Sequence, residues 1–324
     1  MTIFDSDIID NVIKKLSNKV RMNKKTINDL PKFVFVCGKS IFDGNGNLKD
    51  SITLEEEENK RNSIIEKFNN SNVKCVISEK LYNNESVIDT LTFEELLAEL
   101  SDDIIIIVES PGTFCELGAF TVKDKYIKKL FVINDREREH DKSFINEGPG
   151  SKLRQFNSER YIFVNYGNYE EFKINKDILN YIEFIKSKSV KFIPNHDEKK
   201  IDLKNLIYEL LSIIEIFQPI NKEELFKIYV KLKSFNGYNI KNREKHMINS
   251  PSSIINLMND MQLICVNNGY ISKHLDETYN YYNVMFKLNR YQFNNIRSKV
   301  MFEIYNNHID RLGDVTNDYI RVNE

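Results

Sequence analysis

The segment that most constrains the fold is a run of four isoleucines and a valine, from Ile104 to Val108. The run is too short for a buried helix and is rich in β-branched side chains, which is typical of a strand covered on both faces. Ser110-Pro111-Gly112 ends it, and a helix is predicted from Thr113 to about Lys123. Open α/β sheets bind ligands at such a turn between a buried strand and a helix.

Strand and helix patterns alternate on both sides of this run. Four more short apolar segments are predicted to be strands: Lys32–Cys37, Val73–Ile77, Lys129–Ile133 and Tyr161–Val164. Helical patterns lie at residues 54–68, 92–100 and 177–188. The alternation predicts an α/β fold, a five-stranded parallel Rossmann or flavodoxin-like sheet of strand order 2-1-3-4-5 with helices on both faces.

The composition changes after the polar stretch from Pro194 to Lys200. Helical patterns at 203–217, 222–233 and about 251–261 are followed by a hairpin predicted to turn at Asn267-Asn268-Gly269, which is the order of a winged helix. We therefore expect a helical lead-in (1–30), an α/β domain (31–195), a mainly helical winged-helix domain (201–290) and a helical tail (291–324).

Composition argues against several classes of protein. The formal net charge is −2, so any surface for nucleic acid must be local. No apolar run approaches the length of a membrane span, and the first residues lack the layout of a signal peptide. The four cysteines are far apart, which indicates free thiols and no metal site. We expect a cytoplasmic protein that contacts no membrane.

Glu116 is a carboxylate close to the predicted turn, and its position allows two interpretations. Thr113-x-x-Glu116 fits a capping box, in which both side chains bond free N–H groups at the start of a helix. The turn also follows a strand predicted to be central, Pro111-Gly112 would let a ligand approach the backbone, and Gly118 would let the helix pack tightly. These features favour a ligand-binding or catalytic carboxylate.

The end of the first strand is expected to form the other half of the site. Cys37, Gly38 and Lys39 follow directly, and glycine leaves room for a sugar or phosphate. In the predicted strand order, the first and third strands are neighbours, so Gly38 and Lys39 should face the segment from Ser110 to Glu116. A single Gly-Lys pair is a weak signal, and a solvated Lys39 is the plainer alternative.

Polar residues follow two other strands at the same predicted edge. Glu79 comes after the second strand, and Asn134 and Asp135 come after the fourth. Such side chains could bind ribose hydroxyls or tune the pKa of a nucleophile. They could equally cap the helices that follow, and the sequence leaves both roles open.

A family resemblance rests on three segments: Phe35-Val36-Cys37-Gly38-Lys39, residues 109–120, and Ser143-Phe144-Ile145-x-x-Gly148-Pro149. Together they resemble the nucleoside 2-deoxyribosyltransferase-like family of N-glycosidases, and most of all its branch of toxic effectors of bacterial retrons. The resemblance covers about residues 31–190, which would make 31–195 the catalytic domain. The appended winged helix is similar to the same effectors.

The resemblance implies a mechanism and partners. Glu116 matches the family's glutamate nucleophile, and Ser110, Pro111, Gly112 and Thr113 fall in its sugar- and phosphate-contacting turn. It implies hydrolysis of NAD or a related nucleotide without a cofactor, in an anti-phage system. The reverse transcriptase and its RNA-linked single-stranded DNA would hold the enzyme inactive, and a homo-oligomer or filament is compatible with this. Phe114-Cys115 departs from the small residue that typical transferases carry there, so their nucleoside specificity need not apply.

A basic stretch near the C-terminus is the candidate contact for nucleic acid or a protein partner. Residues 278–302 contain no acidic side chain, and their cations are Lys287, Arg290, Arg297 and Lys299. Aromatic residues between these cations could stack on unpaired bases. The alternative, preferred for most of them, is that the aromatics pack a helical tail against the winged helix.

Three functions are thus compatible with the sequence. The leading hypothesis is an N-glycosidase that hydrolyses NAD or a nucleotide through Glu116. A nucleoside 2-deoxyribosyltransferase that exchanges bases is the second. A non-catalytic, nucleotide-sensing, DNA-binding regulator is the third.

Overall fold

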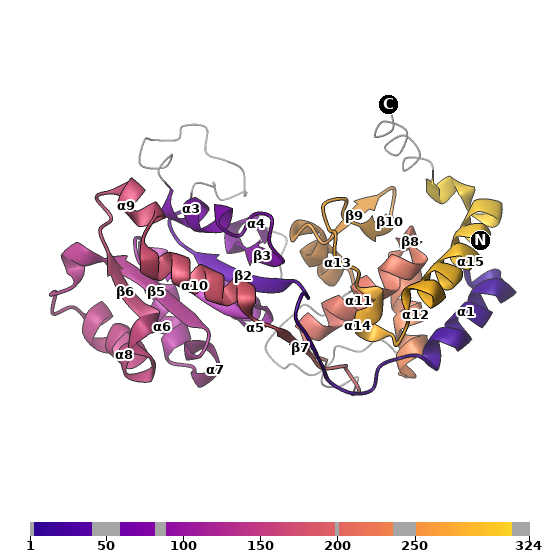
Figure 1. Cartoon of the computed structure of the whole chain (residues 1–324), viewed down its shortest axis with the longest axis horizontal. Helices are drawn as coiled ribbons and strands as arrows, with labels where there is room; N and C mark the ends of the chain where they lie inside the picture. The colour runs from indigo at the N-terminus through magenta and orange to yellow at the C-terminus, as the bar shows by residue number, and fades with distance from the viewer. Residues whose placement is uncertain (1–2, 41–58, 82–88, 198–200, 236–250, 313–324) are drawn as a thin grey trace, which may run out of the picture. The chain divides into compact units, whose positions relative to one another are not determined.

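The computed structural model describes residues 3–40, 59–81, 89–197, 201–235 and 251–312 (Figure 1). The chain divides into two compact units. One consists of residues 27–190 and is called the sheet unit here. The other consists of residues 1–26 and 191–324 and is called the helical unit.

The sheet unit is built on a five-stranded parallel sheet of order β3-β2-β4-β5-β6. The strands are β2 (Lys32–Cys37), β3 (Val73–Val76), β4 (Asp103–Ile107), β5 (Leu130–Asp135) and β6 (Tyr161–Val164). Every neighbouring pair is parallel. This order confirms the predicted order 2-1-3-4-5, since β2 is the first strand of this sheet.

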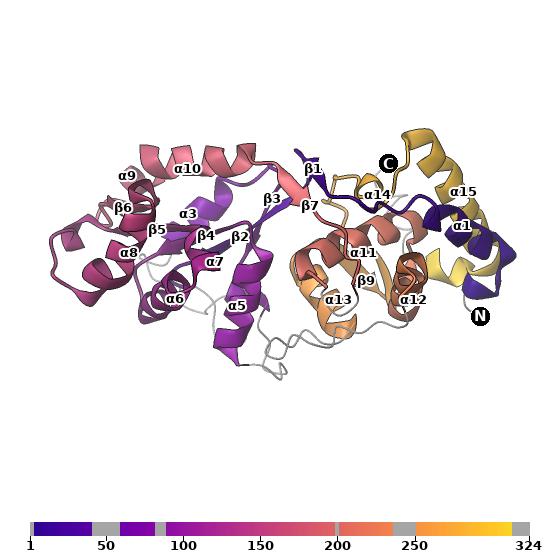
Figure 2. The ribbon, with the colours of Figure 1, turned by 90° about the horizontal axis from the view of Figure 1, so that it is seen from below.

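Helices cover both faces of the sheet (Figure 2). On one face lie α3 (Lys60–Glu66), α9 (Tyr169–Lys173) and α10 (Lys176–Ser187), whose buried side chains share an apolar core with Val34, Ile105 and Ile133. On the other lie α5 (Thr90–Leu100), α6 (Pro111–Thr121) and α7 (Asp124–Ile127). There the Phe35 and Phe120 rings meet edge to face at 6.1 Å. Two buried faces explain why β2 and β4 are apolar along nearly their whole length.

β4 begins one residue before the predicted strand, because Asp103 pairs with Val34 of β2. Asp103 is fully buried and accepts hydrogen bonds from Lys188 Nζ at 2.6 Å and from the Tyr181 hydroxyl at 2.9 Å. These partners allow a carboxylate to open an otherwise apolar strand. The helix predicted from residue 54 is described only as α3, capped by Asn59, because residues 54–58 lie outside the described residues.

The helical unit follows the element order of a winged helix. Its elements after residue 200 are α11 (Leu203–Phe217), β8 (Ile220–Asn221), α12 (Lys222–Lys233), α13 (Pro251–Asp260), β9 (Ile264–Asn267), β10 (Tyr270–Lys273), α14 (Tyr282–Met285) and α15 (Arg290–Asn307). β10 pairs antiparallel with both β8 and β9. Asn268 and Gly269 have φ values of 50° and 80°, which is the turn expected for Asn-Gly and confirms the hairpin.

The N-terminal helix α1 (Asp7–Ser17) belongs to the helical unit and packs against α15 and α12. Arg21 attaches the segment after α1 to α14. Its backbone N–H donates to the Met285 carbonyl at 2.8 Å, and its Nε donates to the Val284 carbonyl at 3.1 Å. β1 (Lys25–Ile27) and β7 (Val190–Phe192) pair where the chain passes from one unit to the other. Among the described helices, none combines the length and apolar character that crossing a membrane requires.

Candidate active site

The turn after β4 is held by its own side chains and leaves Glu116 outside the cap. Ser110 is the N-cap of α6, and its side chain accepts from the Thr113 N–H at 3.4 Å. Thr113 Oγ1 in turn accepts from the Ser110 N–H at 3.0 Å, which completes a capping box one turn earlier than the sequence suggested. The capping interpretation of Glu116 is therefore wrong, and α6 begins at Pro111 and not at Thr113.

Glu116 lies in a cluster of acidic side chains that come from separate helices. Its carboxyl is within hydrogen-bond reach of Glu94 on α5 and of the Cys37 thiol at the end of β2. Glu79, in the short helix α4 (Ser78–Leu81), adds its charge to the same region. Glu116 Oε2 is buried, and no described group hydrogen-bonds to it. A buried carboxylate oxygen without a donor is rare in folded proteins.

Burial and like charge keep protons in this cluster at neutral pH. Burial and the charge of Glu94 raise the pKa of Glu116 to about 8. Burial raises the pKa of Glu94 to about 7, and the Ser78 hydroxyl, a hydrogen-bond donor, opposes that rise. Burial and the Glu116 charge also raise the pKa of Cys37 well above its usual value, so the thiol stays protonated and donates to Glu116.

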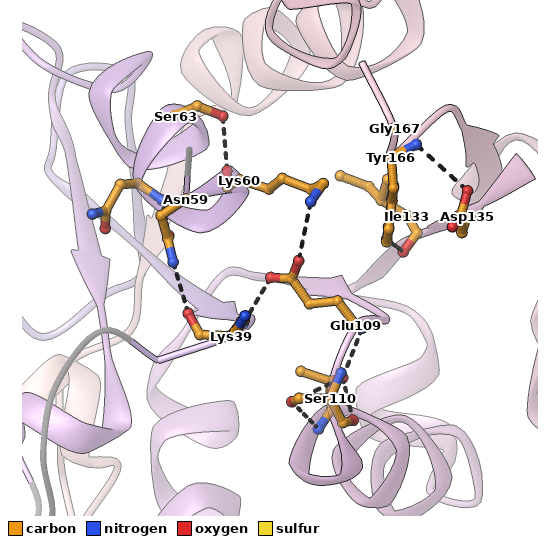
Figure 3. Close-up of polar contacts among 12 residues, drawn as sticks. Lys39, Asn59, Lys60, Ser63, Glu109, Ser110, Ile133, Asp135, Tyr166 and Gly167 are labelled. Atoms are coloured by element: carbon orange, nitrogen blue, oxygen red, sulfur yellow. Dashed lines mark hydrogen bonds and ion pairs between the residues drawn. The ribbon is translucent and has the colours of Figure 1, made fainter. Parts of the chain in front are cut away.

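A second polar group joins β2 to β4 at the same edge of the sheet. Cys37 pairs with Ile106, so the residues that follow the two strands are neighbours. The Lys39 N–H donates to Glu109 Oε1 at 2.8 Å, and Lys60 Nζ lies 3.6 Å from Glu109 Oε2 (Figure 3). Gly38 and Lys39 therefore lie against the end of β4, where Glu109 is the direct contact, one residue before the predicted segment from Ser110 to Glu116.

Tyr166 closes this group on the side of β5. Lys60 Nζ lies 4.8 Å from the centre of its ring, and its hydroxyl donates to the Ile133 carbonyl at 2.7 Å (Figure 3). Burial and the charges of Glu109 and Asp135 raise the pKa of Tyr166 well above its usual value. The phenol is therefore neutral at physiological pH and serves as a fixed donor.

The carboxylate of Glu79 is held by a buried arginine. Arg61 on α3 is 1% exposed, and its Nη1 donates to the two carboxylate oxygens of Glu79 at 2.8 and 2.9 Å. The backbone at Gly38, directly after β2, packs closely against Arg61. A Cβ added to Gly38 would lie 2.9 Å from Arg61 Cβ. Glycine at position 38 is therefore required by the close approach of Arg61.

Comparison with known proteins assigns the chain to a family. A family model described as STM3845 retron effector protein matches residues 57–266, well over half of the sequence. The chain belongs to this family of retron effectors. The matched region contains Arg61, Glu79, Glu94 and Glu116, and it ends within β9.

Two curated proteins of Escherichia coli are similar to the chain. The "Retron Ec86 putative ribosyltransferase/DNA-binding protein" is 32% identical over 147 residues, which is 44% of this chain and 48% of that protein. The "Retron Ec73 putative ribosyltransferase/DNA-binding protein" is 28% identical over 246 residues, which is 71% of this chain and 76% of that protein. The chain thus spans about half the length of the first and three quarters of the second. The retron-effector resemblance is confirmed.

The other predicted binding residues of this retron effector lie at the same edge, with their polar atoms largely used within the fold. Asn134 is buried and donates to the Tyr161 hydroxyl at 2.9 Å. Asp135 is the last residue of β5 and accepts from the N–H groups of Glu137 and Tyr166. Both are strand residues, where the sequence placed them after the strand. Pro111-Gly112 is exposed, as a ligand-contacting turn requires.

Gly118 does not have the packing role expected of it. A Cβ built there meets no described atom within 4 Å, so close packing of α6 on the sheet does not depend on this glycine. Within the described part of the chain, no group of three or more His, Cys, Asp or Glu side chains is arranged to hold a metal ion.

The basic residues of the C-terminal stretch differ in their surroundings. Lys287, Arg290 and Lys299 are exposed, whereas Arg297 Nη1 donates to the Ile216 carbonyl at 2.9 Å, near the end of α11. Most of the interleaved aromatics are packed within the unit, with Tyr281 and Phe286 buried and Tyr282 stacked on Phe293 at 4.1 Å; Tyr291 is 79% exposed.

Sequence reasoning missed Glu94, Glu109, Lys60 and Arg61. Glu94 and Arg61 carry a usable signal, because each occupies a helix face that is otherwise apolar. Glu94 stands three and four residues before the buried Leu97 and Ala98, and Arg61 stands three residues before the buried Ile64. A charged residue on the buried stripe of a helix indicates either a buried ion pair or a functional group.

Proposed function

We propose that this retron effector cleaves the N-glycosidic bond of NAD or a related nucleotide, with Glu116 as the nucleophile. The observation that carries the proposal is the buried Glu116 Oε2, which has no described hydrogen-bond partner at the ligand-binding edge of the sheet. Cleavage of a glycosidic bond passes through an oxocarbenium-like state. A carboxylate against the anomeric carbon stabilises its positive charge and can form a glycosyl intermediate that water resolves.

Glu94 gives the site a place for the proton of the nucleophile. In the free protein, the protonated Glu116 carboxyl donates to the Glu94 carboxylate, since this hydrogen bond raises the pKa of Glu116 and lowers that of Glu94. When a sugar approaches, Glu116 passes the proton to Glu94 and becomes the nucleophilic carboxylate. Protonated Glu94 can then supply that proton to a departing base.

The chemistry of the leaving group favours a cationic base such as nicotinamide. Glu79, Glu94 and Glu116 act on one another as like charges, so this part of the site favours positive charge. The nicotinamide of NAD carries a positive charge and leaves as a neutral molecule without protonation. Its arrival would therefore favour the ionised form of Glu116. No cofactor is needed, because the nucleotide is the substrate.

The test is nicotinamide release from NAD by purified protein. Glu116→Gln keeps the shape of the side chain and removes the nucleophile, so we expect a loss of at least about 10³-fold in rate. Glu99→Gln is the matched control, because Glu99 lies on the same helix as Glu94 and pairs with Lys125. We expect the control to retain full activity. Equal rates for the wild type and Glu116→Gln would refute the nucleophile assignment.

Transfer to an acceptor base is the second candidate, because the names of both relatives contain ribosyltransferase. Hydrolysis and transfer share the glycosyl intermediate and differ in what resolves it. Adding a free purine to the same reaction separates them. A new nucleoside or nucleotide product would establish transfer, and release of free ribosyl product alone would establish hydrolysis.

We further propose that the helical unit contacts the other retron components, the reverse transcriptase and its RNA-linked single-stranded DNA. Support comes from the retron-effector family and from the words DNA-binding in the names of both relatives. Lys287, Arg290 and Lys299 are the exposed cations we assign to that contact. Holding the effector inactive through this unit would allow its release as an NAD-depleting toxin in the cytoplasm during phage infection.

A further inference from the structure

Arg61 is a buried cation whose hydrogen bonds are incomplete. Nη1 donates to both oxygens of Glu79, but Nε and Nη2 are buried and have no described acceptor. A guanidinium offers five N–H groups, and leaving two of its nitrogens unpaired in the interior is strongly unfavourable. A side chain that is 1% exposed in this state indicates an acceptor that is brought by a ligand.

The free nitrogens of Arg61 form the side edge of the guanidinium. Nε–H and one N–H of Nη2 point the same way, so this edge can bind two oxygens of one anion. Phosphate and carboxylate groups match this planar fork, whereas a neutral sugar hydroxyl does not supply two acceptors at that spacing. The opposite corner, Nη1, is already committed to Glu79.

The position of Arg61 relates this edge to the nucleophile. The chain after β2 fixes Arg61 from one side, since a Cβ on Gly38 would lie 2.9 Å from its Cβ and 3.3 Å from its Cδ. Gly38 directly follows Cys37, whose thiol reaches Glu116. Glu79 pairs with Arg61 and also acts electrostatically on Glu116 and Glu94. The unpaired guanidinium edge and the unpaired Glu116 oxygen thus belong to one constellation.

We propose that Arg61 binds a phosphate group of the substrate, so that the enzyme selects phosphorylated nucleotides over nucleosides. This inference rests on the proposed glycosidic cleavage and adds the residue that recognises the phosphate of the substrate. The phosphate completes the hydrogen bonds of Nε and Nη2, while Glu116 faces the sugar. Because the phosphate supplies the acceptors that the buried Nε and Nη2 lack, it is a source of binding energy.

The experiment compares two substrates that differ only in one phosphate, nicotinamide mononucleotide and nicotinamide riboside. We expect the wild-type kcat/KM to favour the mononucleotide by at least about 100-fold. Arg61→Lys keeps the charge but loses the fork, and we expect the preference to fall to about 10-fold or less. Glu79→Gln is the control for the ion pair between Arg61 and Glu79. It should lower kcat/KM for both substrates by the same factor and keep the wild-type preference for the mononucleotide.

Two results would overturn the inference. One is a wild type that cleaves both substrates equally well. The other is an Arg61→Lys variant that loses the same factor on both substrates, which would make Arg61 a positioning residue acting through Glu79. If Arg61→Lys does not fold, Gly38→Ala serves in its place, because the added Cβ must displace Arg61. The same loss of preference is expected of it.

A binding measurement separates failure of this inference from failure of the proposed function. Calorimetry with AMP and adenosine on the Glu116→Gln protein requires no turnover. AMP binding at least about 10-fold tighter than adenosine, with the difference abolished in Arg61→Lys/Glu116→Gln, supports the phosphate site even if neither substrate is cleaved. Equal binding of AMP and adenosine rejects it.

Discussion

Three buried ion pairs of the helical unit contrast with the acidic cluster of the sheet unit. In the helical unit, three of the described buried glutamates each have a cationic partner and backbone or side-chain donors: Glu209 with Lys233, Glu215 with Lys273, and Glu224 with Arg311. Glu277 and Glu303 are also buried, and their Oε1 atoms accept from the Tyr279 N–H and the Asn307 side chain. In the sheet unit, Glu94 and Glu116 face each other, and one oxygen of Glu116 has no described donor. Paired burial is what a stable fold requires, whereas unpaired burial of like charges costs stability.

The contrast is local to the sheet edge and is not a property of the whole sheet unit. Asp103, at the start of β4 and thus at the opposite end of that strand, is fully buried and bonded to Lys188 and Tyr181. A carboxylate with hydrogen-bond and ion-pair partners therefore stands at the beginning of β4. The cluster of Glu94 and Glu116, in which one carboxylate oxygen has no described donor, lies near its end. Such clustering of perturbed acids at one edge is typical of an active site.

The largest effect is expected from breaking a structural pair. Glu224 is buried and takes two hydrogen bonds from Arg311 at 2.7 and 2.9 Å. Burial acts to raise the pKa of Glu224, and the hydrogen bonds from Arg311 outweigh it, so that the pKa lies below its usual value. Glu224→Gln strands the buried arginine, and we expect the free energy of unfolding in urea to fall by about 3–5 kcal/mol.

Glu223→Gln provides the control one residue away, on the exposed side of α12. We expect it to change stability by about 0.5 kcal/mol or less. Glu116→Gln should behave in the opposite way and leave stability unchanged or higher at pH 8, because it removes a buried charge that lacks a cationic partner. A comparable loss in Glu116→Gln and Glu224→Gln would erase the distinction between the two kinds of carboxylate.

The second effect is a dependence of stability on pH that originates in the sheet unit. The pKa values of Glu94 and Glu116 are raised to about 7 and about 8 from an ordinary value of 4.5. Between about pH 4.5 and pH 8, the folded state therefore holds more protons on these two carboxyl groups than the unfolded state does. Their stabilising contribution is complete below about pH 4.5 and is lost as the pH rises through 8.

We expect the free energy of unfolding to decrease by about 2–4 kcal/mol between pH 5 and pH 8.5. The double variant Glu94→Gln/Glu116→Gln should remove most of that slope, because neither amide titrates. Chemical denaturation across the pH range measures both proteins. A slope that is unchanged in the double variant would assign the pH dependence to other groups.

What the sequence predicted well is what local patterns determine. Short β-branched runs predicted the five strands. Their alternation with helices predicted the parallel order and the edge of the sheet at which Glu116 lies, because strand order follows from the elements and their connections. The hairpin at Asn268-Gly269 was equally local, since the turn needs positive φ at both positions.

What the sequence did not reveal comes from helices that meet only in three dimensions. Glu94 and Arg61 are far from Glu116 along the chain and have no motif spacing relative to it. The capping box was placed one turn late, because Ser110 and Thr113 form it between themselves and no pattern distinguishes that pair from Thr113 and Glu116. Tertiary packing decides such choices.

The smallest effect concerns the surfaces of the two units. Changing Lys287, Arg290 and Lys299 together to alanine should weaken binding of single-stranded DNA by about 10-fold and reduce the dependence on salt by about two units of the log–log slope. Arg297 is left in place, because it donates to the Ile216 carbonyl within the fold.

The control changes three exposed lysines of the sheet unit, Lys142, Lys152 and Lys176, and so removes the same charge from the other unit. Fluorescence anisotropy at several salt concentrations measures both variants. Equal weakening would mean that net charge alone attracts DNA, whereas weakening confined to the first variant would assign the contact to the helical unit.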